Sequence, residues 1–453
     1  MAARSYDLVI VGAGSGNMLP AREFEGWRIA VVEADRFGGT CLNRGCIPSK
    51  MLVHTADVAQ AVRQAGRFGI GAKWTGADWA AICGRVFGRI DPLHEQAVRY
   101  RRASGVDVFL GQARFTGPKV LSVGDDELRA DQFVLAAGSR PVIPPLTGLA
   151  DVPYHTSDTV MRLDALPKSM VVLGGGYIAA EMSHIFGSLG TRVTIIAPSK
   201  ELLARHDLDI RARFTRAYAE RFDLRLGATV KRVSATRKGI RLDLATPCGT
   251  QQADGQVLLV ATGRTPNSDS LNVAAAGIEV DAHGHVRTDD TYATNVPGIW
   301  ALGDLANHFQ LKHMANAEAR LVRYNLLHPG QPRRAAFTVV PSAVFADPQV
   351  ASAGATEQDL RAQGRSYTAV TRPYSDTAYG WALEDTGSFV KILTDPATRL
   401  LLGVHLLGPQ ASTLIQPLLQ AMCLGDTVDQ VASGVLYIHP ALTEVIEQAL
   451  LEL

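Results

Sequence analysis

The chain has 453 residues, of which 47% are hydrophobic and 20% charged, a composition typical of a globular protein with about two to four domains. The net charge of +1 gives no electrostatic reason to expect nucleic acid or an anionic membrane as a partner. No run of about 18 apolar residues occurs, so no membrane span is expected. With only five cysteines, no signal peptide and no Cys–His spacing typical of a metal site, the chain is predicted to be cytoplasmic.

A predicted apolar strand opens the chain and runs into a glycine-rich turn. In a dinucleotide-binding fold Gly12 would permit the tight turn, Gly14 would let the backbone approach a pyrophosphate, and a following helix N-terminus would receive the negative charge. A second strand ends at Glu33, 21 residues past Gly12, where such folds place the carboxylate that binds the ribose hydroxyls. Asn17 replaces the third glycine of the motif, which normally allows the helix to pack closely on the strand. This close packing is therefore expected to depend on Gly16.

Two cysteines follow this turn by about one βαβ unit, Cys41 and Cys46, five residues apart. In a regular helix that spacing is roughly 7.5 Å of rise, whereas a disulfide requires Cα atoms within about 7 Å. The segment between them must therefore be irregular, and Gly45 permits this. Pro48 suits the first turn of the next helix, so Cys46 lies near a helix N-terminus, where a thiol pKa is lowered. Because so short a disulfide loop adds little stability, the pair is predicted to be redox-active rather than structural.

A second glycine-rich turn follows about 160 residues after the first. Gly174, Gly176 and Ala179 fit the pattern GxGxxA after a predicted strand. The strand after the next predicted helix ends without an acid, which removes the carboxylate that would select NAD and repel a 2′-phosphate. Lys200 and Arg205 lie just beyond and could pair with that phosphate, although ordinary solvated loop charges would give the same pattern. We therefore expect FAD beside the cysteines and NADPH at the second site.

Several shorter signals agree with two nucleotide-binding domains. Apolar strands end in glycine turns at Gly138 and Gly263, as expected where a chain crosses between such domains. Another short strand ends at Asp304, which could hydrogen-bond the polyol linker of FAD or could simply be a turn residue. From about residue 337, strand-like segments precede two helical stretches, 411–424 and 442–453, which predicts a separate α+β domain.

A histidine near the C-terminus could supply acid–base chemistry. Pro440 is expected in the first turn of the last helix, with His439 just before it and Glu444 about one turn inside it. Glu444 would then accept a hydrogen bond from the imidazole and raise its basicity. Thiol–disulfide exchange needs such a group, because the attacking thiol loses a proton and the leaving sulfur gains one. A surface or capping histidine would give the same pattern, and the redox-active cysteines favour the acid–base interpretation.

Together these motifs resemble the flavin-dependent pyridine nucleotide–disulfide oxidoreductases over nearly the whole chain. The resemblance implies FAD and NADPH as cofactors and a small-molecule disulfide as substrate. Within the family, the sequence is similar to the enzymes that reduce mycothiol disulfide (mycothione), the disulfide of a sugar-bearing thiol. The stretches that carry this likeness are residues 14–17, 87–92, 154–162, 379–386 and 415–418.

The resemblance also implies a role for each site residue. Cys46 would lie next to the flavin, and Cys41 would be the interchange thiol that attacks the substrate. Lys50 and Glu181 would pair near the flavin, and Tyr177 would cover the nicotinamide pocket until NADPH enters.

The resemblance further implies a homodimer in which His439 and Glu444 of one subunit complete the site of the other. The predicted fold is α/β, with two Rossmann-like dinucleotide-binding domains and a C-terminal α+β dimerisation domain. The predicted division is 1–150 for the first part of the FAD-binding domain, 151–265 for the NADPH-binding domain, 266–335 for the central second part of the FAD-binding domain and 336–453 for the interface domain.

Other interpretations fit parts of the pattern. A lipoamide dehydrogenase or a glutathione reductase-like enzyme would share the chemistry, but the former runs toward NAD, and the missing acid at the second site argues against it. A mercuric reductase is disfavoured because the C-terminus carries no cysteine pair. A flavin-binding redox sensor would need reactive cysteines, but it would need neither an NADPH site nor the pair of His439 with Glu444.

Overall fold

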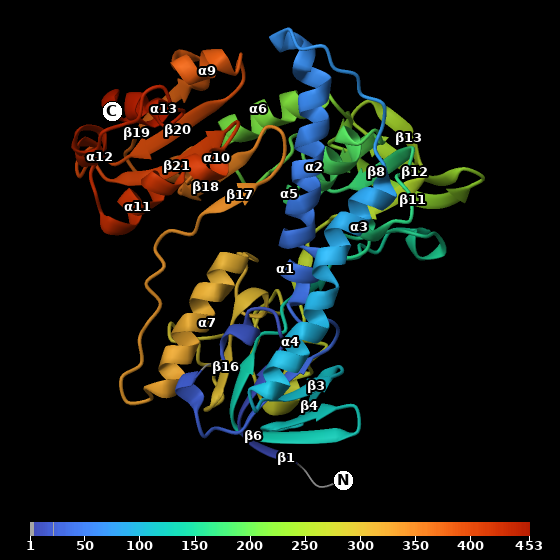
Figure 1. Ribbon diagram of the computed structural model, residues 1–453, viewed down its shortest axis with the longest axis vertical. Coiled ribbons are helices and arrows are strands. Elements are labelled where there is room, and N and C mark those ends of the chain that lie inside the picture. The colour runs from blue at the N-terminus through green and yellow to red at the C-terminus, as the bar shows by residue number, and fades with distance from the viewer. Residues whose placement is uncertain (1–3, 21) are drawn as a thin grey trace.

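The structure is a computed structural model that describes residues 4–20 and 22–453. A lower body is built on one large sheet, and above it a second sheet and a C-terminal sheet lie on either side of the long helix α2 (Cys46–Gln64) (Figure 1). The N-terminus lies at the foot of the lower body, and the C-terminus lies in the upper part (Figure 1).

Seven strands form the lower sheet: β1 (Arg4–Val11), β2 (Ile29–Glu33), β3 (Asp107–Leu110), β4 (Ala113–Gly117), β5 (Val120–Val123), β6 (Asp126–Leu135) and β16 (Ile299–Ala301). Their order is β3-β2-β1-β6-β5-β4, with β16 also paired to β6. The pairs β1–β2, β2–β3, β1–β6 and β6–β16 are parallel, whereas β4 and β5 add an antiparallel edge. Both faces of β1 are buried, since Val9 and Val11 enter one core and Leu8 and Ile10 the other.

The second sheet is a parallel four-stranded sheet in the order β10-β9-β8-β14. Its strands are β8 (Ser169–Leu173), β9 (Arg192–Ala197), β10 (Asp223–Leu226) and β14 (Val257–Val260). Helix α5 (Tyr177–Ser188) connects β8 to β9, and α6 (Leu208–Ala219) connects β9 to β10. An antiparallel sheet follows β10 in the chain: β11 (Thr229–Thr236), β12 (Gly239–Thr246) and β13 (Gly249–Gly255). The two predicted chain crossings pair with each other as β7 (Ser139–Pro141) and β15 (Arg264–Pro266).

The C-terminal part is an antiparallel five-stranded sheet in the order β17-β18-β21-β20-β19, covered by short helices. Its strands are β17 (Ser342–Val344), β18 (Val350–Gly354), β19 (Thr368–Pro373), β20 (Phe389–Thr394) and β21 (Leu401–Leu407). Its helices are α8 (Glu357–Ala362), α9 (Ala378–Ala382), α10 (Ala411–Leu414), α11 (Gln416–Leu424), α12 (Val428–Gly434) and α13 (Glu444–Leu451).

The remaining helices connect the sheets. They are α1 (Gly39–Arg44), α3 (Trp79–Ile90), α4 (Pro92–Ala103) and α7 (Lys312–Leu327). Helices α3 and α4 follow one another along the length of the molecule, and α7 lies on the lower sheet (Figure 1). Short 3-10 segments are η1 (Gly16–Met18), η2 (Arg22–Phe24), η3 (Ala65–Phe68), η4 (Leu149–Asp151), η5 (Val160–Arg162), η6 (Val273–Ala276), η7 (Gly303–Leu305) and η8 (Tyr374–Asp376).

The first glycine-rich turn is not followed by the helix that its motif predicts, so that prediction was wrong. Among the described residues between β1 and β2, only the three-residue segments η1 and η2 are helical. Pro20 accounts for the difference, because proline lacks the N–H that an interior helical residue donates and its ring clashes with the preceding turn. Close packing is kept at Gly16, where a Cβ would come within 2.9 Å of Ile10 Cγ2.

Arg101 of α4 holds this irregular segment in place. Its Nε donates to the side-chain oxygen of Asn17 at 2.8 Å, and its Nη1 donates to the carbonyl of Pro20 at 2.9 Å. Its Nη2 donates to the carbonyl of Asn17. Asn17, the departure from the expected motif, is therefore an anchor point for the segment that takes the place of the helix.

The last helix begins at Glu444, not at Pro440 as predicted. Residues 439–443 form turns, and the His439–Pro440 peptide is cis. Starting at Glu444 places Glu444 and Glu447 in the first turn, where the helix dipole favours carboxylates. The predicted helical stretch at 411–424 is divided into α10 and α11, and α12 was not predicted.

Candidate active site

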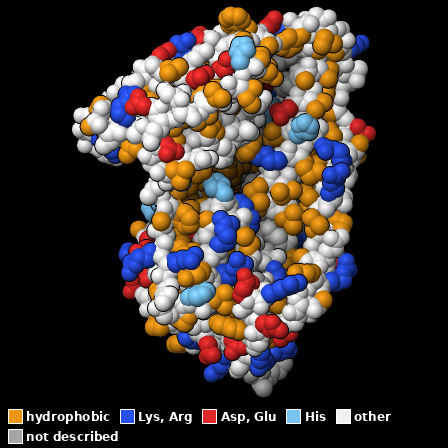
Figure 2. Space-filling model, turned by 60° about the vertical axis from the view of Figure 1, so that its left-hand side comes forward, with side chains coloured by type: hydrophobic (Ala, Val, Ile, Leu, Met, Phe, Trp, Pro, Cys, Tyr) orange, Lys and Arg blue, Asp and Glu red, His pale blue; other side chains and the backbone are white. Residues whose placement is uncertain are grey.

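One large cavity, of about 1370 Å³, is bordered by residues of the lower sheet, of helix α5 and of the C-terminal sheet. Figure 2 shows a hollow between the upper and lower parts of the molecule, with Lys and Arg side chains gathered on the lower part. The predicted site residues in the cavity wall are Gly12, Gly14, Glu33, Cys41, Cys46, Lys50, Gly138, Tyr177, Glu181, Arg205 and Asp304. Those outside the wall are Gly174, Gly176, Ala179, Lys200, Gly263, His439 and Glu444.

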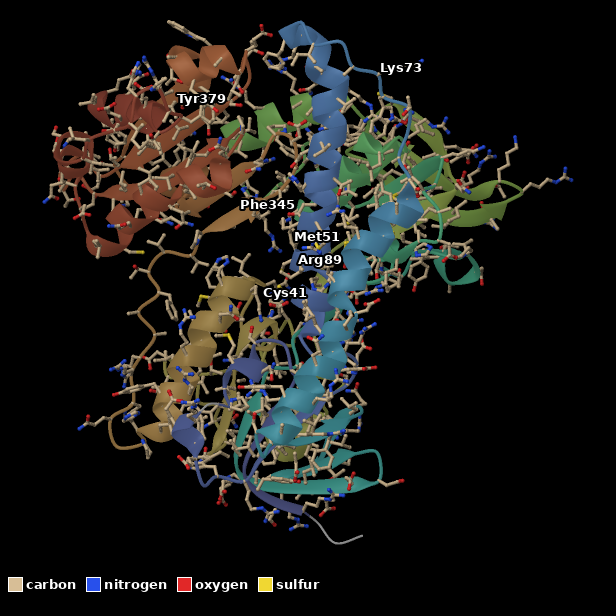
Figure 3. All side chains as sticks on the ribbon, viewed as in Figure 1. Cys41, Met51, Lys73, Arg89, Phe345 and Tyr379 are labelled. Carbon is tan, nitrogen blue, oxygen red and sulfur yellow. The ribbon has the colours of Figure 1, made fainter. Side chains whose placement is uncertain are left out.

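The two cysteines lie on either side of a break between helices. Helix α1 ends at Arg44 and α2 begins at Cys46, and Gly45 between them has φ −133° and ψ −118°. A Cβ on Gly45 would come within 3.0 Å of the carbonyl oxygen of Thr40. The irregular segment that the spacing predicts is therefore confirmed, and Cys41 lies where α1 meets the lower body (Figure 3).

The pair is present as two thiols, because all five cysteines of the chain are free. The predicted disulfide bond is thus open in this structure. A hydrogen bond from the Cys41 thiol lowers the pKa of Cys46 to about 7, and the charge of Lys50 acts in the same direction. The same hydrogen bond, together with burial, raises the pKa of Cys41. Ionisation of the pair is therefore favoured at Cys46, at the N-terminus of α2, over Cys41.

Lys50 and Glu181 form the ion pair that the resemblance implies. Lys50 Nζ lies 3.0 Å from Glu181 Oε1, and the same oxygen accepts a 3.0 Å hydrogen bond from the backbone N–H of Phe345. Lys50 Nζ also lies 3.9 Å from the centre of the Phe345 ring, which is a cation–π contact. Phe345 lies beside α2 (Figure 3), so this pair ties α2, α5 and the C-terminal part together next to the cysteines.

The first nucleotide site has the groups that an FAD molecule requires. Glu33, at the end of β2, accepts a 2.7 Å hydrogen bond from the N–H of Ala13, and burial raises its pKa. Gly12 has φ +103°, and a Cβ there would lie 2.3 Å from the carbonyl oxygen of Ala136. The cavity exceeds the roughly 300–1,000 Å³ of ordinary ligand pockets. The residues present therefore fit a dinucleotide as long as FAD.

The second nucleotide site has the predicted strand–turn–helix geometry. Gly174 has φ +128° directly after β8, and α5 begins at Tyr177. Strand β9 ends at Ala197 without a carboxylate. Lys200 is exposed on the loop after β9, whereas Arg205 borders the main cavity, so the structure does not bring these two cations to one wall of that cavity.

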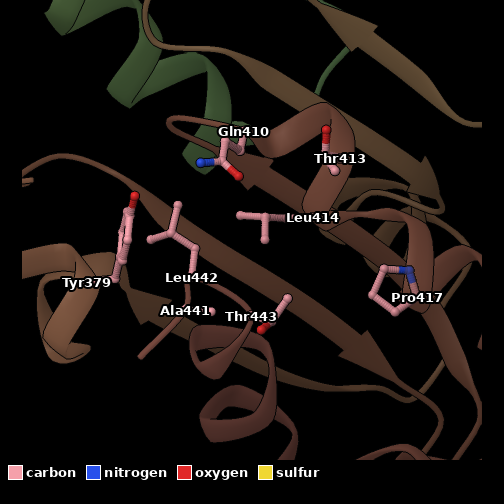
Figure 4. Close-up of a pocket in the computed structure, with 8 residues that line it drawn as sticks. All are labelled: Tyr379, Gln410, Thr413, Leu414, Pro417, Ala441, Leu442 and Thr443. Carbon is pink, nitrogen blue, oxygen red and sulfur yellow. The ribbon is translucent and has the colours of Figure 1, made fainter. Parts of the chain in front are cut away.

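His439 and Glu444 are in contact within one chain. His439 Nδ1 lies 2.7 Å from Glu444 Oε1, as the sequence spacing suggests. The His439 side chain is 73% exposed, and it lies outside the wall of the main cavity. A smaller cavity of about 310 Å³ lies beside this loop (Figure 4), and its wall is formed by Tyr379, Gln410, Thr413, Leu414, Pro417, Ala441, Leu442 and Thr443.

Three polar residues of the cavity wall, Ser139, Arg264 and Lys312, were not predicted as site residues. Ser139 accepts a 2.8 Å hydrogen bond from Arg264 Nε and donates one of 2.6 Å to Asp304 Oδ2, which orients the Asp304 carboxylate. Lys312, the first residue of α7, borders the cavity with both cysteines. No local motif marks these residues, because their contacts join segments more than 100 positions apart in the chain.

Comparison with known proteins agrees with this geometry. Residues 6–319 match the pyridine nucleotide-disulphide oxidoreductase family, and residues 340–450 match its dimerisation domain. Mycothione reductase of Mycobacterium tuberculosis is 44% identical over 99% of each chain. Dihydrolipoyl dehydrogenase of Halobacterium salinarum is 33% identical over 98% of this chain and 95% of its own. The Cu(II) complex of the HOCl-induced flavoprotein disulfide reductase RclA from Escherichia coli matches with a TM-score of 0.87 at 28% identity, over 100% of both chains.

A dithiol beside a dinucleotide cavity, on this fold, defines a flavoprotein disulfide reductase. The chain belongs to the pyridine nucleotide-disulphide oxidoreductase family. It is therefore an NAD(P)H-dependent disulfide oxidoreductase, and its cofactors are FAD and NADPH.

None of the described helices is both long enough and apolar enough to cross a bilayer. In residues 4–20 and 22–453, no group of three or more His, Cys, Asp or Glu side chains is placed to hold a metal ion.

Proposed function

We propose that this enzyme is an NADPH-dependent reductase of mycothiol disulfide. The observation that carries the reductase chemistry is the dithiol of Cys41 and Cys46 in the wall of the dinucleotide cavity. The substrate assignment is supported by the 44% identity to mycothione reductase over 99% of the chain. The preference for NADPH is supported by the end of β9, which lacks the carboxylate that would repel a 2′-phosphate.

The mechanism follows from the polarised thiol pair. Gly12, Gly14 and Glu33 would hold FAD beside the cysteines, where it would supply, from NADPH, the electron pair that opens the Cys41–Cys46 disulfide. Cys41 then attacks the substrate disulfide, so that a Cys41–substrate mixed disulfide forms and the first substrate thiol leaves. Cys46 attacks the Cys41 sulfur next, with the charge of Lys50 favouring its thiolate, which releases the second substrate thiolate to be protonated by water and restores the protein disulfide.

A proton acceptor is required at the first of these steps, because the pKa of Cys41 is raised. We assign this role to His439 of the partner subunit, oriented by Glu444 at 2.7 Å. The imidazole takes the proton of Cys41 and returns it to the departing substrate thiolate. This assignment is supported by the exposed position of His439 outside the cavity wall of its own chain.

The C-terminal part would form the interface of a homodimer. It matches a dimerisation domain over residues 340–450, and apolar side chains are exposed next to His439, with Leu436 99% exposed and Ile438 75% exposed. Such side chains on a surface loop are typical of a contact with another chain. The proposal includes the domain bounds 1–150, 151–265, 266–335 and 336–453. It also includes a cytoplasmic location.

The test is a comparison of turnover with three disulfides, namely mycothiol disulfide, glutathione disulfide and lipoamide, each with NADPH and with NADH. We expect the highest kcat/KM for mycothiol disulfide with NADPH. A dihydrolipoyl dehydrogenase is the second candidate, since relatives of that name are 33% identical over 98% of the chain. A higher kcat/KM for lipoamide with NADH would favour that candidate and would contradict the proposal.

A further inference from the structure

The first glycine-rich turn faces the cavity without the α-helix that usually follows such a turn. In a dinucleotide-binding fold, that helix brings N–H groups and about half a positive charge to the pyrophosphate. Here the turn continues into η1, which has three residues, and then reaches Pro20. Since a pyrophosphate carries about two negative charges, we expect positive charge to come to Gly14 and Ser15 from another part of the chain.

Lys312 reaches this turn from α7. Its Nζ donates a 2.9 Å hydrogen bond to Oγ of Ser15, and Ser15 donates a 3.1 Å hydrogen bond to Oδ1 of Asn316. Lys312 and Asn316 are four residues apart on α7, so the helix holds Ser15 between two side chains on one face. Gly14, Ser15 and Lys312 all border the main cavity. The ammonium group therefore lies at the point where the glycine-rich turn meets the space for the cofactor.

Lys312 has no carboxylate at ion-pair distance among the described residues, and Cys41, Cys46 and Asp304 are the negative groups that act on its charge. Lys50 pairs with Glu181, and Arg44 pairs with Asp35, but Lys312 forms no ion pair with a carboxylate in residues 4–20 and 22–453. Burial of this ammonium is unfavourable and lowers the pKa of Lys312, and the charges of Cys41, Cys46 and Asp304 offset only part of that effect. An anionic group in the cavity would remove this penalty.

We propose that Lys312 binds the pyrophosphate of FAD and supplies, at the first glycine-rich turn, the positive charge that the missing helix would otherwise provide. A lysine ammonium carries a full charge, whereas a helix N-terminus carries about half of one. Lys312 is thus a cofactor-binding residue on α7, although it lies 297 positions after Ser15 in the chain. This inference does not depend on the identity of the disulfide substrate.

The experiment measures cofactor affinity directly in the apoenzyme. Wild-type protein, Lys312→Met, Lys312→Gln and Lys312→Arg are titrated with FAD by flavin fluorescence, and ADP and adenosine are used as competitors. ADP contains the pyrophosphate, and adenosine does not. Arg320→Met is the matched control, because it removes one positive charge from the exposed face of the same helix.

Loss of one charge-assisted hydrogen bond should weaken FAD and ADP binding by roughly tenfold to hundredfold in Lys312→Met. Adenosine should compete equally well with all variants, Lys312→Arg should stay within about threefold of wild type, and Arg320→Met should match wild type. Lys312→Gln keeps a donor for Ser15 and serves if the methionine variant does not fold. It should show the same loss as Lys312→Met.

Two results would overturn the proposal. One is wild-type affinity for ADP in Lys312→Gln, or a loss that is equally large for adenosine. The other is unchanged FAD affinity together with a higher pKa of Cys46, measured by iodoacetamide alkylation of the reduced apoenzyme. In that second case Lys312 would serve the thiols and not the cofactor.

Discussion

At the scale of single residues, the two thiols differ before any substrate is present. The hydrogen bond from Cys41 stabilises the Cys46 thiolate and lowers its pKa to about 7, while the pKa of Cys41 is raised. A free cysteine titrates near pH 8.5, so at neutral pH a far larger fraction of Cys46 is thiolate, about half, than in an ordinary cysteine. The thiolate therefore forms more easily at Cys46, whereas Cys41 tends to keep its proton. Because Cys41 must lose this proton before it attacks the substrate, a separate base is needed.

The first prediction tests this polarisation. Replacing Cys41 by alanine removes the donor to the thiolate, so we expect the pKa of Cys46 to rise from about 7 toward the ordinary value of about 8.5. The rate of alkylation of reduced protein by iodoacetamide, measured against pH, reports this pKa, because only the thiolate reacts. Cys41→Ser is the control, since its hydroxyl can still donate. An unchanged pH profile in Cys41→Ala would show that another group stabilises the thiolate.

At the scale of elements, the site depends on the break between α1 and α2. Gly45 brings the last turn of α1 against the first residue of α2, and the space around its Cα is filled by Thr40 and Cys41. No side chain fits there without movement of backbone atoms. Gly45 therefore allows the close approach of α1 to α2 across which the two thiols are hydrogen-bonded.

The second prediction concerns Gly45→Ala. A Cβ at 3.0 Å from the Thr40 carbonyl oxygen must push the two helices apart, so we expect a loss of about 1–3 kcal/mol in stability and a higher pKa of Cys46. Gly88→Ala is the control, because Gly88 lies inside α3 with nothing within 4 Å of a new Cβ, and alanine there should stabilise by about 0.5–1 kcal/mol. Urea unfolding of both variants gives the comparison. Equal stability of Gly45→Ala and wild type would contradict this account of the break.

Local signals explain which elements could be predicted from the sequence. The break at Gly45 and the strand that ends at Glu33 follow from residue spacing and were predicted correctly. The prediction of a helix after Gly12 was wrong, because the glycine pattern favours a helix there whereas Pro20 prevents one. Lys312 could not be found in this way, because its contact with Ser15 joins residues 297 positions apart.

At the scale of the whole molecule, a buried lysine joins the C-terminal sheet to the second sheet. Lys391 of β20 is 2% exposed, and its Nζ lies 2.9 Å from Asp207 Oδ1, 2.6 Å from Asp209 Oδ2 and 2.5 Å from Glu357 Oε2. Although burial opposes it, hydrogen bonds from the Glu357 N–H and from Lys391 lower the pKa of Asp207. The cluster fixes the part of the chain that carries His439 relative to α6 and the loop before it.

The third prediction is that Lys391→Met loses roughly 3–5 kcal/mol at neutral pH, because buried carboxylates are left without their counter-ion. In wild type the lowered pKa values of Asp207 and Glu357 contribute stability above the ordinary carboxyl pKa of about 4, and acid removes it. In the variant those carboxyls protonate more easily, so its deficit should shrink as the pH falls from 7 to 5. Thermal unfolding midpoints measure both effects, with the exposed Lys73→Met as control. A deficit that does not change with pH would exclude the electrostatic explanation.

The last prediction tests whether the active site is shared between two chains. Cys41→Ser and His439→Ala homodimers should each lose disulfide turnover, the first for lack of the attacking thiol and the second for lack of its base. In a heterodimer of the two variants, purified with two different tags, one site combines an intact Cys41 with the intact His439 of the partner subunit. About half of the wild-type kcat per dimer should therefore return. If His439 acted on the cysteines of its own chain, neither site of the heterodimer would be complete, and turnover would stay at the level of the single variants.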